Sequence, residues 1–98
     1  MYQIREVFKA KPGKAKDLVK IFKQASPHFE KTEGVKNTRV LTDVVSDYWT
    51  VVIESEVEDI GSFMSKLRSA TASPELKEIM KGYMDFVESG YRALFLIE

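Results

Sequence analysis

One carboxylate and one arginine, on two separate predicted strands, are the residues best placed to do chemistry in this chain. Glu54 lies within one segment of alternating apolar residues, and Arg5 lies within another near the N-terminus. A carboxylate that faces an enclosed space pairs with a cation or is neutralised, and either arrangement can orient a polar ligand. Tyr48 and Val52 fall on the same predicted strand face as Glu54, because residues two apart along a strand share a face.

These four residues form the predicted ligand-binding set, to which Arg39 or Arg92 adds a second candidate cation. The competing interpretation is an ion pair between Arg5 and Glu54, within one sheet or between two subunits, that serves structure alone. No catalytic residue can be assigned on this basis.

The other reactive residue types give weaker signals. His28 is the only histidine and cysteine is absent, which excludes multi-histidine metal sites, thiolate metal sites and thiol nucleophiles. Asp43 and Asp47 lack the further ligands of a calcium loop, and no phosphate-binding glycine loop is present. We therefore expect no metal and no cofactor.

The composition limits the partners of the chain. Fifteen basic and fifteen acidic residues cancel, so there is no electrostatic reason to expect nucleic acid or an anionic membrane surface. No segment approaches the roughly 18 apolar residues of a membrane span, and the N-terminal residues are charged where a signal peptide is apolar. We expect a cytoplasmic protein whose 98 residues form one domain, residues 1–98.

Apolar patterning predicts four strands. They cover residues 2–10, 35–45, 48–57 and 91–98. Ser46-Asp47 is expected to form a hairpin turn between the two middle strands. Trp49 shares a predicted strand face with Val51 and Ile53, so it is expected to pack in the core.

The first helical region begins near Ala15, where apolar residues recur at spacings of three and four. Pro27 is expected to interrupt it, because proline inside a helix removes a backbone hydrogen bond. Ser26 would then cap a further turn, which ends at Gly34.

The second helical region is predicted in two parts. Asp59 is expected to cap the first part, and Ser73 the second, with Pro74 as its first residue. The second part is expected to stop at Gly90, after an apolar stripe of Leu76, Ile79, Met80, Tyr83, Met84 and Val87.

The resulting order, β-α-β-β-α-β, is that of the α+β, ferredoxin-like plait, a four-stranded antiparallel sheet with helices on one face. Apolar residues on both sides of the strands would leave one sheet face in water in a monomer. We therefore expect a homodimer in which these faces pack together. The space between the two sheets would hold a small apolar or aromatic molecule.

Three stretches resemble the dimeric α/β-barrel superfamily, in its NIPSNAP-like and antibiotic-biosynthesis-monooxygenase-like branches. They are residues 2–14, which include a Lys-Pro-Gly-Lys turn, residues 53–59 and residues 88–92. The resemblance implies a homodimeric barrel. It also implies an alternative to ligand binding, a cofactor-independent monooxygenase; a structural or regulatory dimerisation module is the other alternative.

The haem-degrading relatives within this superfamily are a poor match. The tryptophan that they carry at the exit of the third strand corresponds to Ile53, and they need a histidine on the second helical region, where this chain has none. An asparagine on the first strand is also missing. The sequence therefore does not support a haem oxygenase.

Overall fold

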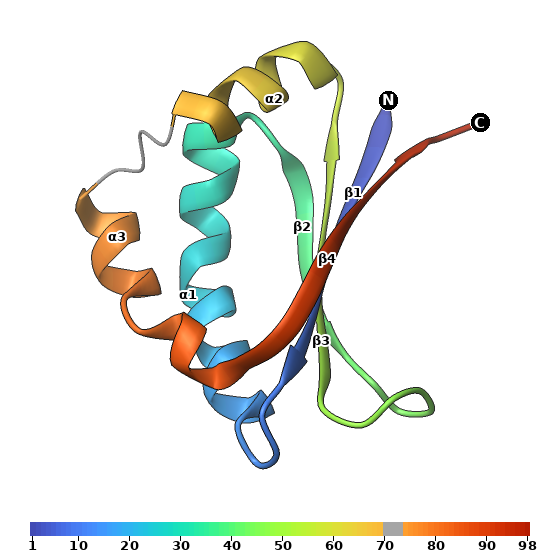
Figure 1. Ribbon diagram of the computed structural model, residues 1–98. Coiled ribbons are helices and arrows are strands. Elements are labelled where there is room, and N and C mark those ends of the chain that lie inside the picture. Colours follow the sequence, from blue (N-terminus) through green and yellow to red (C-terminus); the bar gives the residue numbers. More distant parts are fainter. Residues whose placement is uncertain (70–73) are drawn as a thin grey trace.

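The computed structural model describes residues 1–69 and 74–98, which form a single sheet with helices on one side of it (Figure 1). The elements in chain order are β1 (Tyr2–Ala10), α1 (Ala15–Glu33), β2 (Lys36–Thr42), β3 (Thr50–Val57), α2 (Ile60–Ser69), α3 (Pro74–Met80), the short 3-10 helix η1 (Tyr83–Phe86) and β4 (Val87–Leu96). The strands are antiparallel and lie in the order β2-β3-β1-β4. The predicted α+β, ferredoxin-like fold is confirmed.

The strand β1 lies between β3 and β4 and sends alternate residues to the two sides of the sheet. Ile4 and Phe8 pack against the helices, on the side that we call the helix face. Arg5 and Val7 point to the other side, the open face, which carries no helix. By strand pairing the open face also carries Arg39 and Leu41 of β2, Val52 and Glu54 of β3, and Tyr91, Ala93 and Phe95 of β4.

The core lies between α1 and the helix face. Leu18 and Phe22 of α1 are fully buried against Val51 and Ala10 of the sheet. A second cluster, formed by Ile4, Val35, Val57 and Phe63, lies at the other end of α1. Because both clusters use only the helix face, burial within one chain leaves the open face uncovered.

The helix α1 is continuous, so the predicted interruption at Pro27 is wrong. Ser26 is not a cap, since its hydroxyl donates to the carbonyl oxygen of Phe22 at 2.8 Å. Phe29 follows the proline and packs against both core clusters, and this burial offsets the backbone hydrogen bond that proline removes. Gly34 ends the helix with a φ of 69°, as predicted.

The strands β2 and β3 are shorter than predicted, and residues 43–49 form a loop in place of a two-residue turn at Ser46-Asp47. Trp49 has a φ of 63° and its side chain is 40% exposed, so the prediction that it packs in the core is wrong. Tyr48 also lies in this loop and outside β3.

Hydrogen bonds at the base of the loop explain why strand pairing stops early. The Asp43 carboxylate accepts a hydrogen bond from the Thr50 backbone N–H at 2.9 Å. The Thr50 hydroxyl in turn donates to the carbonyl oxygen of Asp47 at 2.8 Å. Short polar side chains compete with strand pairing for backbone groups. These bonds therefore end the pairing of β2 with β3 at the base of the loop.

The last helix ends, and the last strand begins, earlier than predicted. Gly82 follows α3 with a φ of 79°, and η1 then leads into β4 at Val87. Gly90 lies within β4 opposite Phe8 and does not end a helix. A Cβ atom at this position would lie 2.9 Å from the carbonyl oxygen of Val7, so the close approach of β1 requires glycine there.

The start of the second helical region agrees with the sequence. The Asp59 carboxylate accepts a hydrogen bond from the Ser62 N–H at 3.0 Å, which confirms the predicted cap. The predicted cap at Ser73 lies outside the described residues. The predicted stripe that follows is buried at Leu76 but not at Met84, which is 61% exposed.

Replacement of Gly90 by alanine tests its assignment to β4. We expect Gly90→Ala to lower the free energy of unfolding by about 1–3 kcal/mol, because the new methyl group overlaps backbone that cannot move freely. Urea unfolding measures this change. Gly61→Ala in α2 is the control. It should keep or raise the stability, because alanine favours a helix more than glycine does and the new methyl group has room. Equal stability of the two variants would contradict the assignment.

Candidate functional site

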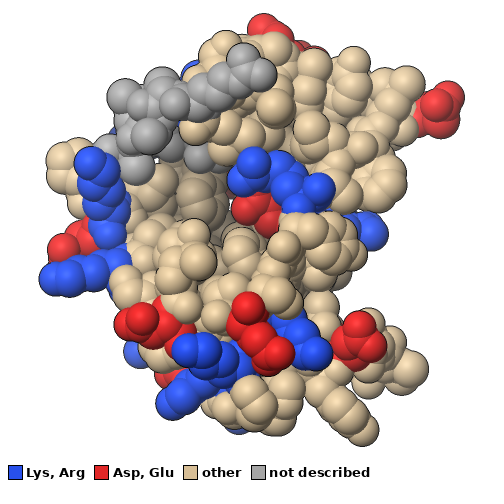
Figure 2. Space-filling view, viewed as in Figure 1, with Lys and Arg blue, Asp and Glu red and all other residues tan. Residues whose placement is uncertain are grey.

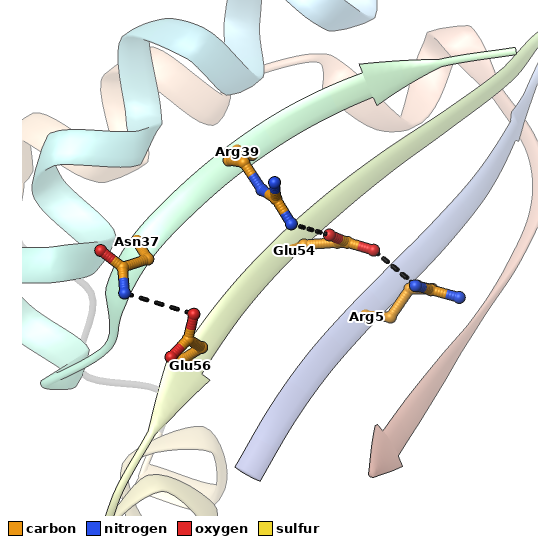
Figure 3. Close-up of polar contacts among 5 residues, drawn as sticks. All are labelled: Arg5, Asn37, Arg39, Glu54 and Glu56. Atoms are coloured by element: carbon orange, nitrogen blue, oxygen red, sulfur yellow. Dashed lines mark hydrogen bonds and ion pairs between the residues drawn. The ribbon is translucent and has the colours of Figure 1, made fainter. Parts of the chain in front are cut away.

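Glu54 accepts hydrogen bonds from two arginines on the open face (Figure 3). Arg5 donates from Nε and Nη2 to Oε2 at 2.9 and 2.6 Å, and Arg39 donates from Nη2 to Oε1 at 2.8 Å. The Glu54 side chain is only 7% exposed, whereas those of Arg5 and Arg39 are 44% and 67% exposed. Strand pairing places the three residues opposite one another on β2, β3 and β1.

This row of side chains extends to the fourth strand. The Arg5 guanidinium lies 5.8 Å from the ring centre of Phe95 on β4, within cation–π range. Beside the row, the Asn37 amide donates to the Glu56 carboxylate at 3.2 Å (Figure 3). The network therefore links all four strands, and both oxygens of Glu54 already have donors from within the chain.

The structure brings together three of the four predicted ligand-binding residues. Arg5, Val52 and Glu54 share the open face, and the predicted pair between Arg5 and Glu54 is present. Tyr48 is separate from them, because it lies in the 43–49 loop and is 80% exposed. Of the two further candidates, Arg39 joins the network, whereas Arg92 lies on the helix face.

A cavity of about 180 Å³ lies on the opposite side of the sheet, beneath the helices. Its walls are mostly apolar, and they include Phe22 and Phe29 of α1, Ile53 of β3 and Phe63 of α2. The Phe8 ring lies 5.0 Å from that of Phe22 and 6.4 Å from that of Tyr83, so one wall is aromatic. Figure 2 shows the molecule hollowed between the helices and β4.

Glu6 and Arg92 form the polar end of this cavity. They face each other on β1 and β4, and Arg92 donates from Nε to Oε1 of Glu6 at 2.5 Å. Their side chains are 25% and 43% exposed, so they lie where the cavity meets solvent. The Ser55 hydroxyl also lines the cavity, but it is hydrogen-bonded to the Thr38 hydroxyl at 3.1 Å.

The pair between Glu6 and Arg92 can form further hydrogen bonds. Among the described residues, neither the second oxygen of Glu6 nor the two Nη groups of Arg92 has a hydrogen-bond partner. A carboxylate oxygen only accepts hydrogen bonds when ionised, and guanidinium groups only donate them. The polar end of the cavity therefore offers one acceptor and several donors side by side.

The sequence contained a signal for this second site. Glu6 falls between Ile4 and Phe8 on the strand face that packs against the helices, where the other side chains are apolar. A charged residue in the middle of an apolar row indicates either a buried ion pair or a functional group. Its partner, Arg92, lies in the predicted strand 91–98, but that strand is apolar on both sides, so alternation does not assign Arg92 to the face of Glu6.

The described residues contain no group of three or more histidine, cysteine, aspartate or glutamate side chains that could hold a metal ion. Within the same part of the chain, no helix is long and apolar enough to cross a membrane.

The fold places the chain among ferredoxin-like proteins, and solved structures similar to it have two kinds of description. An uncharacterized NIPSNAP domain protein from Burkholderia xenovorans has a TM-score of 0.80 and 13% identity, covering 100% of this chain and 95% of that one. A NIPSNAP family protein from Agrobacterium tumefaciens has a TM-score of 0.82 and 8% identity, covering 99% and 85%.

The second kind is described as a "putative antibiotic biosynthesis monooxygenase". The protein of this description from Bordetella bronchiseptica has a TM-score of 0.79 and 15% identity, covering 99% of this chain and 96% of that one. No protein-family model matches the sequence, and no curated protein matches it. The resemblance to the NIPSNAP-like and monooxygenase-like branches is thus confirmed at the level of the fold.

Neutralisation of Glu54 tests the energetic role of the open-face network. Glu54→Gln keeps the shape of the side chain but leaves two arginines without their carboxylate, so we expect a loss of about 1–2 kcal/mol in the free energy of unfolding. The loss should shrink at high salt, which screens the repulsion between the arginines. Urea unfolding at low and high salt measures both effects.

Glu58→Gln is the matched control for this experiment. Glu58 pairs with Lys36 at 3.5 Å, and both side chains are largely exposed, so its replacement should change stability little. Equal free energies of unfolding for Glu54→Gln and Glu58→Gln would show that the network does not stabilise the fold.

Proposed function

We propose that this protein binds a small aromatic molecule in the cavity beneath its helices and acts as a homodimer through its open face. The observation that carries the first part is an aromatic-lined cavity with the Glu6–Arg92 pair at one end. Binding sites for small molecules are typically apolar hollows with a few polar groups that fix the orientation of the ligand.

The size of the cavity supports this proposal. At about 180 Å³ it exceeds the roughly 150 Å³ of an engineered apolar cavity that binds benzene. Glu6 and Arg92 lie where the cavity meets solvent, so a ligand could enter from this end.

The polar end narrows the class of ligand. Glu6 and Arg92 together carry no net charge, so they favour a neutral polar group over a carboxylate or an ammonium ion. A hydroxyl or amide group can donate to the free oxygen of Glu6 and accept from Arg92. The ligand that fits this description is a single aromatic ring, or two fused rings, bearing such a group.

The open face is better suited to a second subunit than to a ligand. The Glu54 carboxylate is saturated by Arg5 and Arg39, which leaves little polar capacity for a small molecule between the sheets. The apolar residues of this face, such as Val52, Tyr91 and Phe95, would lie in water in a monomer. Three of the four predicted ligand-binding residues, Arg5, Val52 and Glu54, lie on this face. Their positions fit the competing interpretation, in which Arg5 and Glu54 form a structural ion pair at a subunit interface.

The exposed area favours the same conclusion. The isolated chain exposes 6566 Å², whereas a folded monomer of 11.2 kDa exposes about 5,700 Å² by the scaling of surface with mass. The excess is close to the roughly 800 Å² that each partner buries in an ordinary stable interface.

Catalysis is a second candidate function, a monooxygenase that uses no cofactor. It is favoured by the description of the Bordetella bronchiseptica structure and by the position of Glu6, a carboxylate that can accept a proton from a bound phenol. The distinguishing result is consumption of dioxygen when protein and ligand are mixed, with loss of that activity but retention of binding in Glu6→Gln.

A pair of adjacent substitutions distinguishes the cavity from the space between the sheets. Ile53 lies opposite Glu6 and lines the cavity, so Ile53→Phe should fill it and reduce phenol binding at least tenfold. Val52 points to the open face, and Val52→Phe should leave phenol affinity unchanged. Calorimetric titration with phenol, the simplest ring that carries a hydroxyl group, measures both variants.

The reverse pattern would contradict the proposed site. Loss of binding in Val52→Phe and in Glu54→Gln, with normal binding in Ile53→Phe, would place the ligand between the sheets, as the sequence first suggested. Thermal unfolding of each variant shows whether the added ring has damaged the fold.

The dimer has its own test. We expect sedimentation equilibrium at micromolar concentration to give about twice the chain mass of 11.2 kDa. Tyr91→Asp, which puts a charge in the middle of the open face, should shift the protein to monomer, whereas Met84→Asp on the helix side should not. A wild-type protein that sediments as a monomer would refute the interface.

A further inference from the structure

A second hollow lies outside the cavity described above, between the start of α1 and the 43–49 loop. This groove has a volume of about 480 Å³, within the roughly 300–1,000 Å³ of typical small-molecule sites. Its walls come from the first turns of α1, the end of β2 and the loop itself, and they share no residue with the cavity beneath the helices. Figure 1 shows the loop and the start of α1 at the same end of the molecule.

The loop supplies two aromatic side chains to this groove. Tyr48 is 80% exposed and Trp49 is 40% exposed, so the groove is open to solvent on this side. Ala15 and Val19 of α1 also line the groove, and they are half-buried because they pack against the core as well. The groove therefore offers an apolar surface on which one face of a ligand can lie while the other face stays in water.

The backbone of Trp49 is held in an unfavourable conformation. Its φ of 63° lies in the left-handed region, which a bulky side chain rarely adopts. Hydrogen bonds on both sides hold it there: the Trp49 carbonyl oxygen accepts from the Ala10 N–H at 2.8 Å, and the Thr50 N–H donates to the Asp43 carboxylate at 2.9 Å. Residues that are fixed in strained conformations cluster at binding sites. This conformation leaves the indole ring of Trp49 at the groove and not in the core.

Two side chains of opposite charge line the groove without pairing. Within the described residues, Lys16 and Asp43 form no ion pair with each other, and the Lys16 ammonium group has no other partner. Asp43 accepts one hydrogen bond from the Thr50 N–H, and a carboxylate can accept more than one. The charges of the open face differ in this respect, because Arg5 and Glu54 are paired. The groove therefore presents both a free donor and a free acceptor.

From these features we propose that the groove binds a neutral saccharide. A pyranose ring carries C–H groups on one face and hydroxyl groups around its rim. The C–H face would pack on the ring of Trp49 and remove apolar surface from water. A hydroxyl group both donates and accepts hydrogen bonds, so neighbouring hydroxyls of one sugar can donate to Asp43 and accept from Lys16.

The charges and the openness of the groove favour this class of ligand over two others. Lys16 and Asp43 together carry no net charge, so an ionic ligand is attracted by one of them and repelled by the other. An aromatic ligand on Trp49 would leave its second apolar face in water, because this side of the groove is open. A saccharide in the same position keeps its outer hydroxyl groups hydrated.

Ligand-observed NMR with neutral methyl glycosides, those of glucose, galactose and N-acetylglucosamine, tests the proposal. We expect saturation transfer from the protein to the ring C–H protons of at least one glycoside, and none to glycerol, which has hydroxyl groups but no apolar face. Because Trp49 is the only tryptophan, titration with the same glycoside should move the emission of the protein to shorter wavelength. Absence of transfer to all of these glycosides would overturn the proposal.

Two substitutions test where the glycoside binds. Trp49→Gly removes the ring, and glycine adopts a φ of 63° readily, so the fold should be kept while the affinity falls at least about tenfold. Lys16→Met should lower the affinity by about tenfold through loss of a charged donor, whereas its matched control outside the groove, Lys81→Met, should not change it. Thermal unfolding shows whether each variant is folded. Unchanged affinity in either folded groove variant would overturn the site.

Phenol separates this groove from the cavity beneath the helices. Ile53→Phe, which fills the cavity, should leave the glycoside affinity unchanged, and Trp49→Gly should leave the phenol affinity unchanged. Loss of glycoside binding in Ile53→Phe, with normal glycoside binding in Trp49→Gly, would show that the sugar enters the cavity and would overturn the groove as its site. The phenol result bears on the proposed function alone, so the two proposals can fail separately.

Discussion

The alternation of side chains along β1 and β3 is the constraint on which the whole structure depends. Neighbouring residues serve opposite sides of the sheet: Arg5 and Glu54 join the network on the open face, whereas Glu6 and Ile53 line the cavity beneath the helices. A slip of one residue in strand pairing would exchange the two sets and bury charges in the core. The register therefore decides both where a ligand can bind and which surface remains for a partner.

Two features hold that register in place. The Arg39–Glu54–Arg5 row forms only when the three strands are correctly aligned, because each guanidinium must reach one carboxylate oxygen. Gly90 allows β4 to approach the carbonyl of Val7, which no larger residue permits. The polar network of the open face thus stabilises the geometry of the cavity on the other side, without contacting it.

The division between the two faces also leaves this short chain with a small core. The fully buried side chains are few, and they concentrate around Phe22 and Leu18 where α1 crosses the sheet. A second copy on the open face, as proposed above, would add the apolar burial that so small a core lacks. The proposed ligand and the proposed second copy would each stabilise the folded chain, because each binds the folded state and not the unfolded one.

The sequence predicted the fold well wherever a local pattern and long-range packing agree. β1 has the expected bounds, because its alternation is complete and a proline and a glycine follow it directly. Gly34 and Asp59 end and begin helices as expected, since capping depends on nearby backbone groups alone. Such features require no knowledge of distant parts of the chain.

The predictions were wrong where contacts between residues far apart in the sequence determine the local structure. Burial of Phe29 keeps α1 intact beyond Pro27, and the approach of Val7 places Gly90 in a strand. The candidate site was predicted in part: the pair between Arg5 and Glu54 follows from strand alternation, but Tyr48 was assigned to a strand that begins two residues later. The pair of Glu6 and Arg92 spans 86 residues, and it depends on the face that Arg92 takes in β4, which local patterns did not give.

Diffraction from a crystal held under xenon shows whether the binding space lies beneath the helices, as proposed, or between two sheets. Xenon binds in apolar space, so the experiment does not require the natural ligand to be known. We expect a strong peak among Phe8, Phe22 and Tyr83 in each subunit, with two open faces in contact and no xenon between them. A peak between the open faces, beside Val7 and Val52, together with an empty space beneath the helices, would contradict it.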